Sequence, residues 1–297
     1  MLQWRSSPAA TLHARAPAQG SRAWARLSRD PAAWISGVLI AALVGVSVLA
    51  PLLAPHNPDT LFQNGLSAIG GPLPPTAQFP LGTDQFGRDE LSRLLYGGRT
   101  ALLISVSASA ASAVVGFILG AAAGLTGGWV DTLVSRLANV LMSFPLTLFA
   151  VAMVMIVSPG PGSLIAVTSA IYWTYTARLV RAETMALKEA EFVVAARTSG
   201  ATWGRLLWRH ILPNVLDTVI VRFTLSIAQT FLLEAGLSYL GVGVQPPTPD
   251  WGLMVAQSQN FYAQDPGLVL YPGAAIALAS IAFSVFGDSL RRALRHS

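Results

Sequence analysis

Few residues of this chain could carry out chemistry, and they are scattered. Cysteine is absent, which excludes disulfides, thiolate metal sites and cysteine nucleophiles. The single lysine, Lys188, does not follow a glycine, so the chain has no glycine-lysine loop that could cradle ATP. The histidines have no second ligand at metal spacing, so we predict no metal, cofactor or catalytic site. They are His13, His56, His210 and His296.

Carboxylates occur at two places where they could act. Asp84 and Asp89 alternate with Arg88 and Arg93 in a polar segment. A catalytic acid pair is one interpretation, and a solvated charge network that holds a loop is the favoured one. Glu234 lies near the end of an apolar run, where a carboxylate is costly unless it faces protein or water. We take Glu234 as a candidate pathway residue, with a structural hydrogen-bond acceptor as the favoured alternative.

The composition predicts a membrane protein. Charged residues make up 11% of the chain and hydrophobic ones 53%, whereas a soluble domain carries about 25% charged residues. Several apolar runs are long enough to cross a hydrocarbon layer of about 30 Å as helices. We therefore expect an all-α integral membrane protein with six transmembrane helices. The expected spans are residues 32–53, 100–125, 139–157, 164–181, 215–237 and 271–289.

Three of these spans have features of their own. The second carries small residues at helical spacing, which predicts close helix packing. Pro145 lies inside the third, beyond a short polar connection at residues 131–139, and should kink that span. Arg222 lies near the start of the fifth and should reach toward the lipid headgroups.

The basic residues indicate the topology. With both termini in the cytoplasm, fifteen of the 19 arginine and lysine residues lie on the inner side. This topology also accounts for the net charge of +5, so no nucleic-acid partner is expected. Residues 1–30 read as a disordered basic cytoplasmic tail that contacts membrane lipid. Residues 31–97 comprise the first transmembrane helix and an irregular external loop, and 291–297 form a cytoplasmic tail.

Residues 183–213 are too polar to cross hydrocarbon and must lie in water beside the membrane. Good helix formers dominate residues 184–197, and Gly200 should end that helix. A second helix is expected at 203–212, closed by Pro213 before the next apolar run. The segment is therefore predicted to form a hairpin of two helices that projects into the cytoplasm.

The spacing of Ala195-Ala196, Gly200 and Leu212-Pro213 resembles the EAA loop in the membrane subunits of ABC importers. In that family the loop docks the cytoplasmic ATPase. Two residues depart from the pattern, because Val194 replaces the usual glutamate and His210 the usual isoleucine. An ordinary cytoplasmic hairpin of another polytopic protein is the alternative. The residues that the resemblance marks for coupling are Glu189, Val194, Ala195, Ala196, Gly200, Ala201, Leu212 and Pro213.

Residues 82–99, residues 234–257 and the GD-x-x-R ending near residue 288 are similar to the permeases of dipeptide, oligopeptide and nickel importers. The extreme end, Arg-His-Ser, departs from that group. The resemblance implies a type I ABC permease domain over residues 98–290, in a bacterial inner membrane. It also implies a heterodimer with a second permease, two ATPase subunits that hydrolyse ATP, and an extracytoplasmic solute-binding protein. The expected cargo is a di- or oligopeptide or a related small solute.

Two other classes of protein stay open from the sequence. An ion-coupled secondary transporter would need intramembrane carboxylates, and Glu234 is the lone candidate. An integral membrane enzyme would need a cluster of polar groups near one face, for which the acids at residues 84–90 are the available set. No simple motif identifies the substrate.

Overall fold

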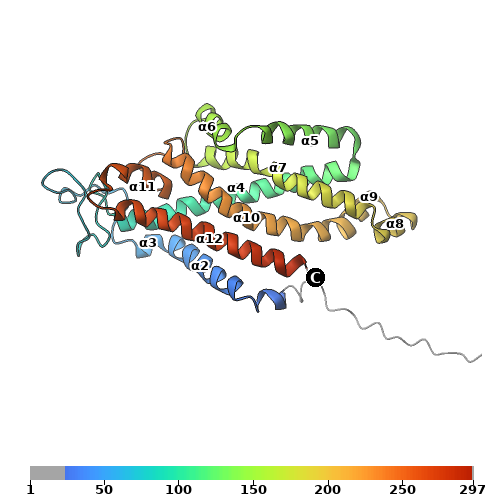
Figure 1. The fold of residues 1–297 in the computed structure, drawn as a ribbon, viewed down its shortest axis with the longest axis horizontal. Helices are drawn as coiled ribbons and strands as arrows, with labels where there is room; N and C mark the ends of the chain where they lie inside the picture. Colours follow the sequence, from blue (N-terminus) through green and yellow to red (C-terminus); the bar gives the residue numbers. More distant parts are fainter. Residues whose placement is uncertain (1–23, 296–297) are drawn as a thin grey trace, which may run out of the picture.

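The apolar runs form long helices that pack side by side in an elongated bundle (Figure 1). This computed structural model describes residues 24–295, so most of the predicted basic tail lies outside the described residues. The helices are α2 (Pro31–Val48), α3 (Ala50–Leu53), α4 (Glu90–Thr126), α5 (Gly128–Ser143), α6 (Leu146–Val157), α7 (Pro161–Lys188), α8 (Glu191–Thr198), α9 (Trp203–Leu206), α10 (Leu212–Tyr239), α11 (Trp251–Ser258) and α12 (Gly267–Arg295). The predicted all-α fold is confirmed.

Between four and five membrane spans are supported by length and composition among the described residues. The helices α2, α4, α10 and α12 each qualify alone, and α5 with α6 qualifies as a bent pair. Helix α7 is not among these candidates, so the span predicted at residues 164–181 stays a prediction. The C-terminal helix continues to Arg295, which makes most of the predicted tail at 291–297 helical.

The third predicted span is bent at Pro145, as expected, but its helix begins earlier than predicted. Helix α5 already begins at Gly128, so the supposed polar connection is helical. It ends at Ser143, and α6 starts at Leu146 with the chain bent by 98°. Pro145 lies in the break, because proline lacks the N–H that would continue the helix and its ring clashes with the preceding turn.

Helix α4 begins ten residues before the span predicted from Thr100. Asp89 provides the start signal, since its carboxylate accepts the backbone N–H of Ser92 at 3.0 Å. Further along, the predicted small-residue face of α4 packs closely on α7. A Cβ atom added at Gly120 would lie 2.5 Å from the Ala177 carbonyl oxygen, which no side chain could tolerate without moving the helices apart.

The charge network of the loop before α4 is buried, which contradicts the solvated network predicted from its sequence. Arg88 Nε lies 2.6 Å from Asp84 Oδ2, and Arg93 Nε lies 3.3 Å from the same oxygen. Arg93 Nη1 also donates to the Pro58 carbonyl at 3.1 Å. All three charged side chains are buried because the chain before α4 folds over them. The loop is therefore an ordered cap on this end of the bundle.

Candidate functional site

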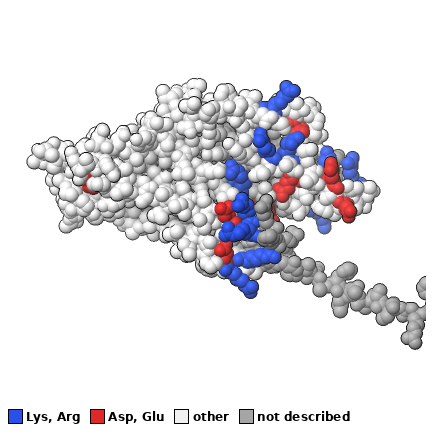
Figure 2. Space-filling view, in the orientation of Figure 1, with Lys and Arg blue, Asp and Glu red and all other residues white. Residues whose placement is uncertain are grey.

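The polar hairpin lies at the opposite end of the bundle from this cap (Figure 1). Figure 2 shows Lys, Arg, Asp and Glu side chains gathered at the hairpin end, with few along the length of the bundle. Helix α7 reaches this end, where Lys188 Nζ donates to the Leu125 carbonyl of α4 at 3.0 Å. Glu183 of α7 accepts from Thr218 of α10 at 3.0 Å. The hairpin is thus tied to three long helices.

Helix α8 is the outermost element of the hairpin. It packs inward through Val193, which is buried, and presents Val194 and Ala195 outward. Ala196 is half-buried on the same helix. Gly200 has a φ of +86°, a conformation that glycine adopts readily, and it turns the chain after α8. Because the side chains of Ala195 and Ala196 are small, another protein could approach the backbone of α8 closely.

The remaining predicted coupling residues are spread along the hairpin. Glu189 is exposed between α7 and α8, and Ala201 is half-buried just after Gly200. Leu212 and Pro213 lie in the first turn of α10. The structure therefore places the residues of the predicted coupling set along one hairpin, from the end of α7 to the start of α10.

The predicted second helix of the hairpin does not end at Pro213. The chain runs from α9 through a π-helical turn, Leu207–Ile211, directly into α10. Proline is tolerated in the first turn of a helix, where its missing N–H costs little. The wider π turn before it leaves this helix continuous with the membrane-spanning one, so a displacement of the hairpin would act directly on α10.

Glu234 lies in a closed polar cluster near the far end of α10. Its side chain is 1% exposed and accepts a hydrogen bond from Ser238 Oγ at 3.0 Å. Asp250 lies beside Glu234, and its carboxyl group accepts the backbone N–H of Leu253 at 3.0 Å, capping α11. Burial raises the pKa of the Asp250 carboxyl group. Two neighbouring buried carboxyl groups favour one retained proton over two like charges.

Helix α11 covers this cluster. Trp251 Nε1 donates to the Leu94 carbonyl of α4 at 2.8 Å. A Cβ added at Gly252 would lie 2.4 Å from the Ala235 carbonyl oxygen of α10, so the two backbones are in close contact. The geometry favours the structural role for Glu234 over an open position on a pathway, and its pathway role stays a prediction.

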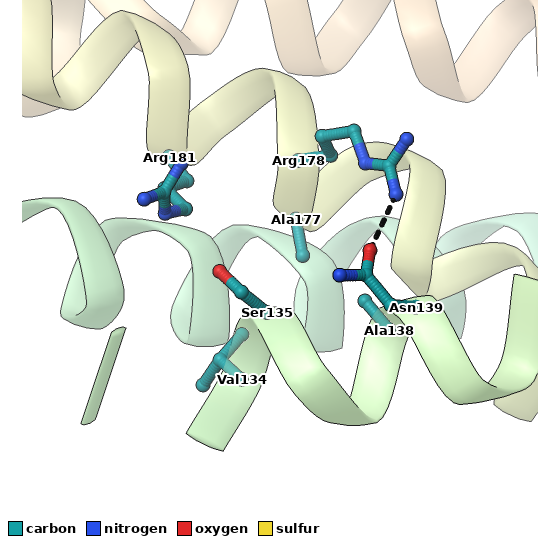
Figure 3. A pocket seen from close by; sticks show the side chains of 7 residues that line it. All are labelled: Val134, Ser135, Ala138, Asn139, Ala177, Arg178 and Arg181. Atoms are coloured by element: carbon teal, nitrogen blue, oxygen red, sulfur yellow. Dashed lines mark hydrogen bonds between the residues drawn. The ribbon is translucent and has the colours of Figure 1, made fainter. Parts of the chain in front are cut away.

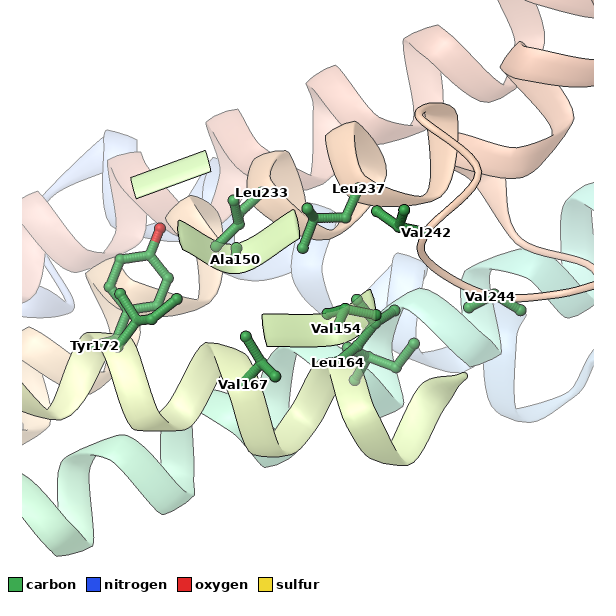
Figure 4. Close-up of a cluster of buried hydrophobic side chains, with 11 residues drawn as sticks. Ala150, Val154, Leu164, Val167, Tyr172, Leu233, Leu237, Val242 and Val244 are labelled. Atoms are coloured by element: carbon green, nitrogen blue, oxygen red, sulfur yellow. The ribbon is translucent and has the colours of Figure 1, made fainter. Parts of the chain in front are cut away.

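A buried apolar cluster lies beside the same end of the bundle (Figure 4). It joins α4, α6, α7 and α10 with the loop that follows α10. Tyr172 is at its edge, with the phenolic hydroxyl directed toward α10 (Figure 4). The buried members are Ile104, Ala150, Val154, Leu164, Val167, Ile171, Tyr172, Leu233, Leu237, Val242 and Val244.

A cavity of about 310 Å³ opens between α5 and α7 (Figure 3). Arg178 Nη2 donates to Asn139 Oδ1 at 2.9 Å across it. Arg181 forms an ion pair with Asp131. The lining residues are Val134, Ser135, Ala138, Asn139, Ala177, Arg178 and Arg181. The sequence did not indicate this cavity, because its polar residues come from two separate helices.

Arg222 does not reach back toward the headgroups, contrary to expectation. Its two Nη atoms donate to Gln229 Oε1, each at 3.1 Å, seven residues further along α10. The guanidinium lies 5.3 Å from the centroid of the Tyr175 ring on α7. An arginine inside an apolar run was visible in the sequence, whereas the two partners that hold it away from the headgroups were not.

Comparison with known proteins shows which family has this polar hairpin joined to a membrane bundle. The family described as the binding-protein-dependent transport system inner membrane component matches residues 116–297, more than half of the chain. The chain belongs to this family. A second pattern, the N-terminal TM domain of oligopeptide transport permease C, matches residues 18–75. This family member is an inner-membrane transport subunit rather than an enzyme, and it works with an ATPase and a binding protein.

Curated relatives cover nearly the whole permease. It is 35% identical over 277 residues to a dipeptide transport system permease of Alkalihalophilus pseudofirmus, covering 92% of this chain and 88% of that protein. It is 37% identical over 270 residues to a putative peptide permease of Brucella suis, covering 90% and 88%. It is 33% identical over 271 residues to a glutathione transport system permease of Pectobacterium atrosepticum, covering 91% and 89%. The predicted ABC permease is thereby confirmed, ahead of a secondary transporter or a membrane enzyme.

Proposed function

We propose that this permease carries di- or oligopeptides, or a closely related small solute such as glutathione, across the inner membrane. The relatives named for dipeptide, peptide and glutathione transport are the observation that carries this substrate class. The permease would form a heterodimer with a distinct second permease, above two ATPase subunits and below the binding protein. This subunit supplies half of the pathway and no catalytic chemistry of its own.

The coupling residues at 189–213 would receive the movement of the ATPases. The exposed Val194 and Ala195 and the half-buried Ala196 support this role, because small side chains allow a short helix to seat deeply in a partner's cleft. Val194 cannot form the ion pair that a glutamate would make there. The continuous path from α9 into α10 would transmit the movement to the membrane region.

A topology of six spans with both termini in the cytoplasm fits these roles. Helix α7 and the bent pair α5 and α6 would complete the six. The concentration of charge at the hairpin end supports its position on the cytoplasmic side (Figure 2). The capped end with α11 would then face the binding protein.

Uptake by the complete importer tests the proposed function. The complex of both permeases and both ATPases is placed in proteoliposomes with the binding protein outside and ATP inside. We expect accumulation of dipeptides with ATP and none with a non-hydrolysable ATP analogue. Accumulation that persists without hydrolysis would contradict an ATP-driven importer, and transport of an unrelated solute would contradict the substrate class.

A further inference from the structure

Arg222 is a charged residue within a membrane-spanning helix. Such a charge faces protein or water, because exposing it to hydrocarbon is costly. Gln229, which holds its guanidinium, is exposed on the surface of the chain, and Arg222 itself is half-buried. A cation and an amide on this face of α10 therefore indicate that the face is turned away from lipid, toward a water-filled space or a second protein.

The charge of Arg222 is not neutralised within the described residues. No ion pair found between residues 24 and 295 includes it. Its Nε atom is buried without a hydrogen-bond partner among those residues. The Nη atoms are held by the neutral oxygen of Gln229 alone. The guanidinium therefore keeps binding capacity for an anion.

Two tyrosines of α7 border the guanidinium. Tyr175 lies under it at cation–π distance, which stabilises the charge without neutralising it. The Tyr172 hydroxyl donates to the Gln229 backbone carbonyl at 3.5 Å, linking α7 to α10 at this level. Tyr172 also belongs to the apolar cluster of Figure 4. The cation thus lies next to that cluster, on the side toward the hairpin.

We propose that Arg222 binds the carboxylate of the transported peptide as the substrate passes the apolar cluster. This inference rests on the proposed function. A carboxylate accepts two parallel N–H bonds from a guanidinium, and these charge-assisted bonds are stronger than those to a neutral amide. The substrate carboxylate would displace Gln229, which occupies the guanidinium in the empty protein. When the substrate leaves, Gln229 binds the guanidinium again.

The competing occupant is an acidic side chain of the partner permease. Such an ion pair would hold the two subunits together, and its loss would impair assembly and ATPase stimulation as well as uptake. A substrate site predicts a different pattern, in which uptake of carboxylate peptides falls while the complex assembles and responds to its binding protein. The two roles can therefore be separated by measuring both activities.

The test uses the complete importer in proteoliposomes, supplied with an equimolar mixture of alanyl dipeptides or with the same dipeptides as C-terminal amides. Mass spectrometry quantifies what accumulates, and ATPase activity stimulated by the binding protein is measured in parallel. The variants are Arg222→Gln and Arg222→Lys. Arg136→Gln is the matched control, because Arg136 is an exposed arginine of α5 outside this cluster.

We expect Arg222→Gln to lower uptake of the free acids about tenfold, the scale of losing hydrogen bonds to a charged group. Uptake of the amides and the stimulated ATPase activity should change less than about twofold. Arg222→Lys should be intermediate, because lysine keeps the charge but not the planar pair of donors. The control should behave as wild type.

Equal loss for acids and amides, unchanged uptake of the acids, or a joint loss of uptake and ATPase stimulation would overturn the proposal. If the wild type does not transport the amides, the free acids alone test the proposal. In that case, reduced uptake of the acids by Arg222→Gln with retained stimulation of the ATPase activity supports the site. Absence of any dipeptide uptake by wild type would instead contradict the proposed function, so the two failures are distinguishable.

Discussion

At the scale of single residues, the cost of burying charge shapes the capped end of this permease. Arg93 is 0% exposed and Glu234 is 1% exposed. Neither is isolated, because Arg93 lies against Asp84 and Glu234 against Asp250. Removing one partner of a buried ion pair, such as that of Arg93 and Asp84, leaves the other charge uncompensated, which is far more destabilising than losing a surface ion pair.

Asp84→Ala tests this contrast. The substitution leaves the buried guanidiniums of Arg88 and Arg93 without their shared carboxylate, so the loss of stability should be about 3–5 kcal/mol. Asp288→Ala is the matched control, since its ion pair with Arg291 is solvent-exposed and should contribute about 0–1 kcal/mol. Thermal unfolding of the purified permease complex measures both. Similar melting temperatures for the two variants would contradict the burial argument.

Asp250→Asn tests the carboxyl pair through pH. Burial raises the pKa of Asp250 above its usual 3.8, so the folded protein holds a proton that the unfolded chain releases. Stability from this group is therefore full below about pH 4 and is lost as pH rises through the raised value. Asparagine keeps an oxygen that can cap α11 and has no titrating proton of its own.

Melting temperatures of the purified complex between about pH 4 and about pH 8 check this prediction. The wild type should lose stability relative to Asp250→Asn as pH rises. A constant difference between the two proteins across this range would show that the pair holds no such proton.

At the scale of elements, apolar length predicted the helices well and their ends poorly. The runs at 32–53, 215–237 and 271–289 correspond to helices because hydrocarbon length is a local property of the sequence. Their ends depend on contacts. Asp89 starts α4 by capping it, and the π turn before Pro213 joins two helices that composition alone separates.

The sites were predictable to different degrees for the same reason. The predicted coupling residues fall within one segment, 189–213, so a resemblance to a family motif could mark them, and their role stays a prediction. The partners of Glu234 and Arg222 were not predictable, because Asp250 and Tyr175 belong to other elements of the chain. The sequence could show only that Glu234 and Arg222 are charged residues within apolar runs. Tertiary packing decided what each one meets.

Gly120→Val tests the close packing of α4 on α7. The added side chain would meet the Ala177 backbone, which cannot move unless the whole helix moves. Overpacking typically lowers the free energy of unfolding by about 1–3 kcal/mol, and we expect a loss of about 3 kcal/mol or more here. Gly45→Val in α2 is the matched control, because an added Cβ there meets nothing within 4 Å. The yield of monodisperse complex in detergent and its melting temperature check both. A similar loss for the two variants would point to helix propensity instead of packing.

At the scale of the whole molecule, the two ends of the bundle are built for different tasks. The end with α11 is closed by buried polar pairs and by the apolar cluster of Figure 4. The hairpin end is charged and exposes small side chains on α8 (Figure 2). Helix α10 joins the two ends through its continuous connection to α9. We infer that movement of the hairpin reaches the closed end along α10.

Affinity purification of the tagged permease, with Ala196→Arg beside wild type, tests the central claim most directly. Wild type should bring down two ATPase subunits and a second permease. Ala196→Arg should insert normally and keep the second permease, but lose the ATPases, because a long charged side chain cannot seat against a cleft that accepts alanine. Ala25→Arg, at an exposed alanine outside the hairpin, should retain them. Retention of both ATPases by Ala196→Arg would contradict docking through the hairpin.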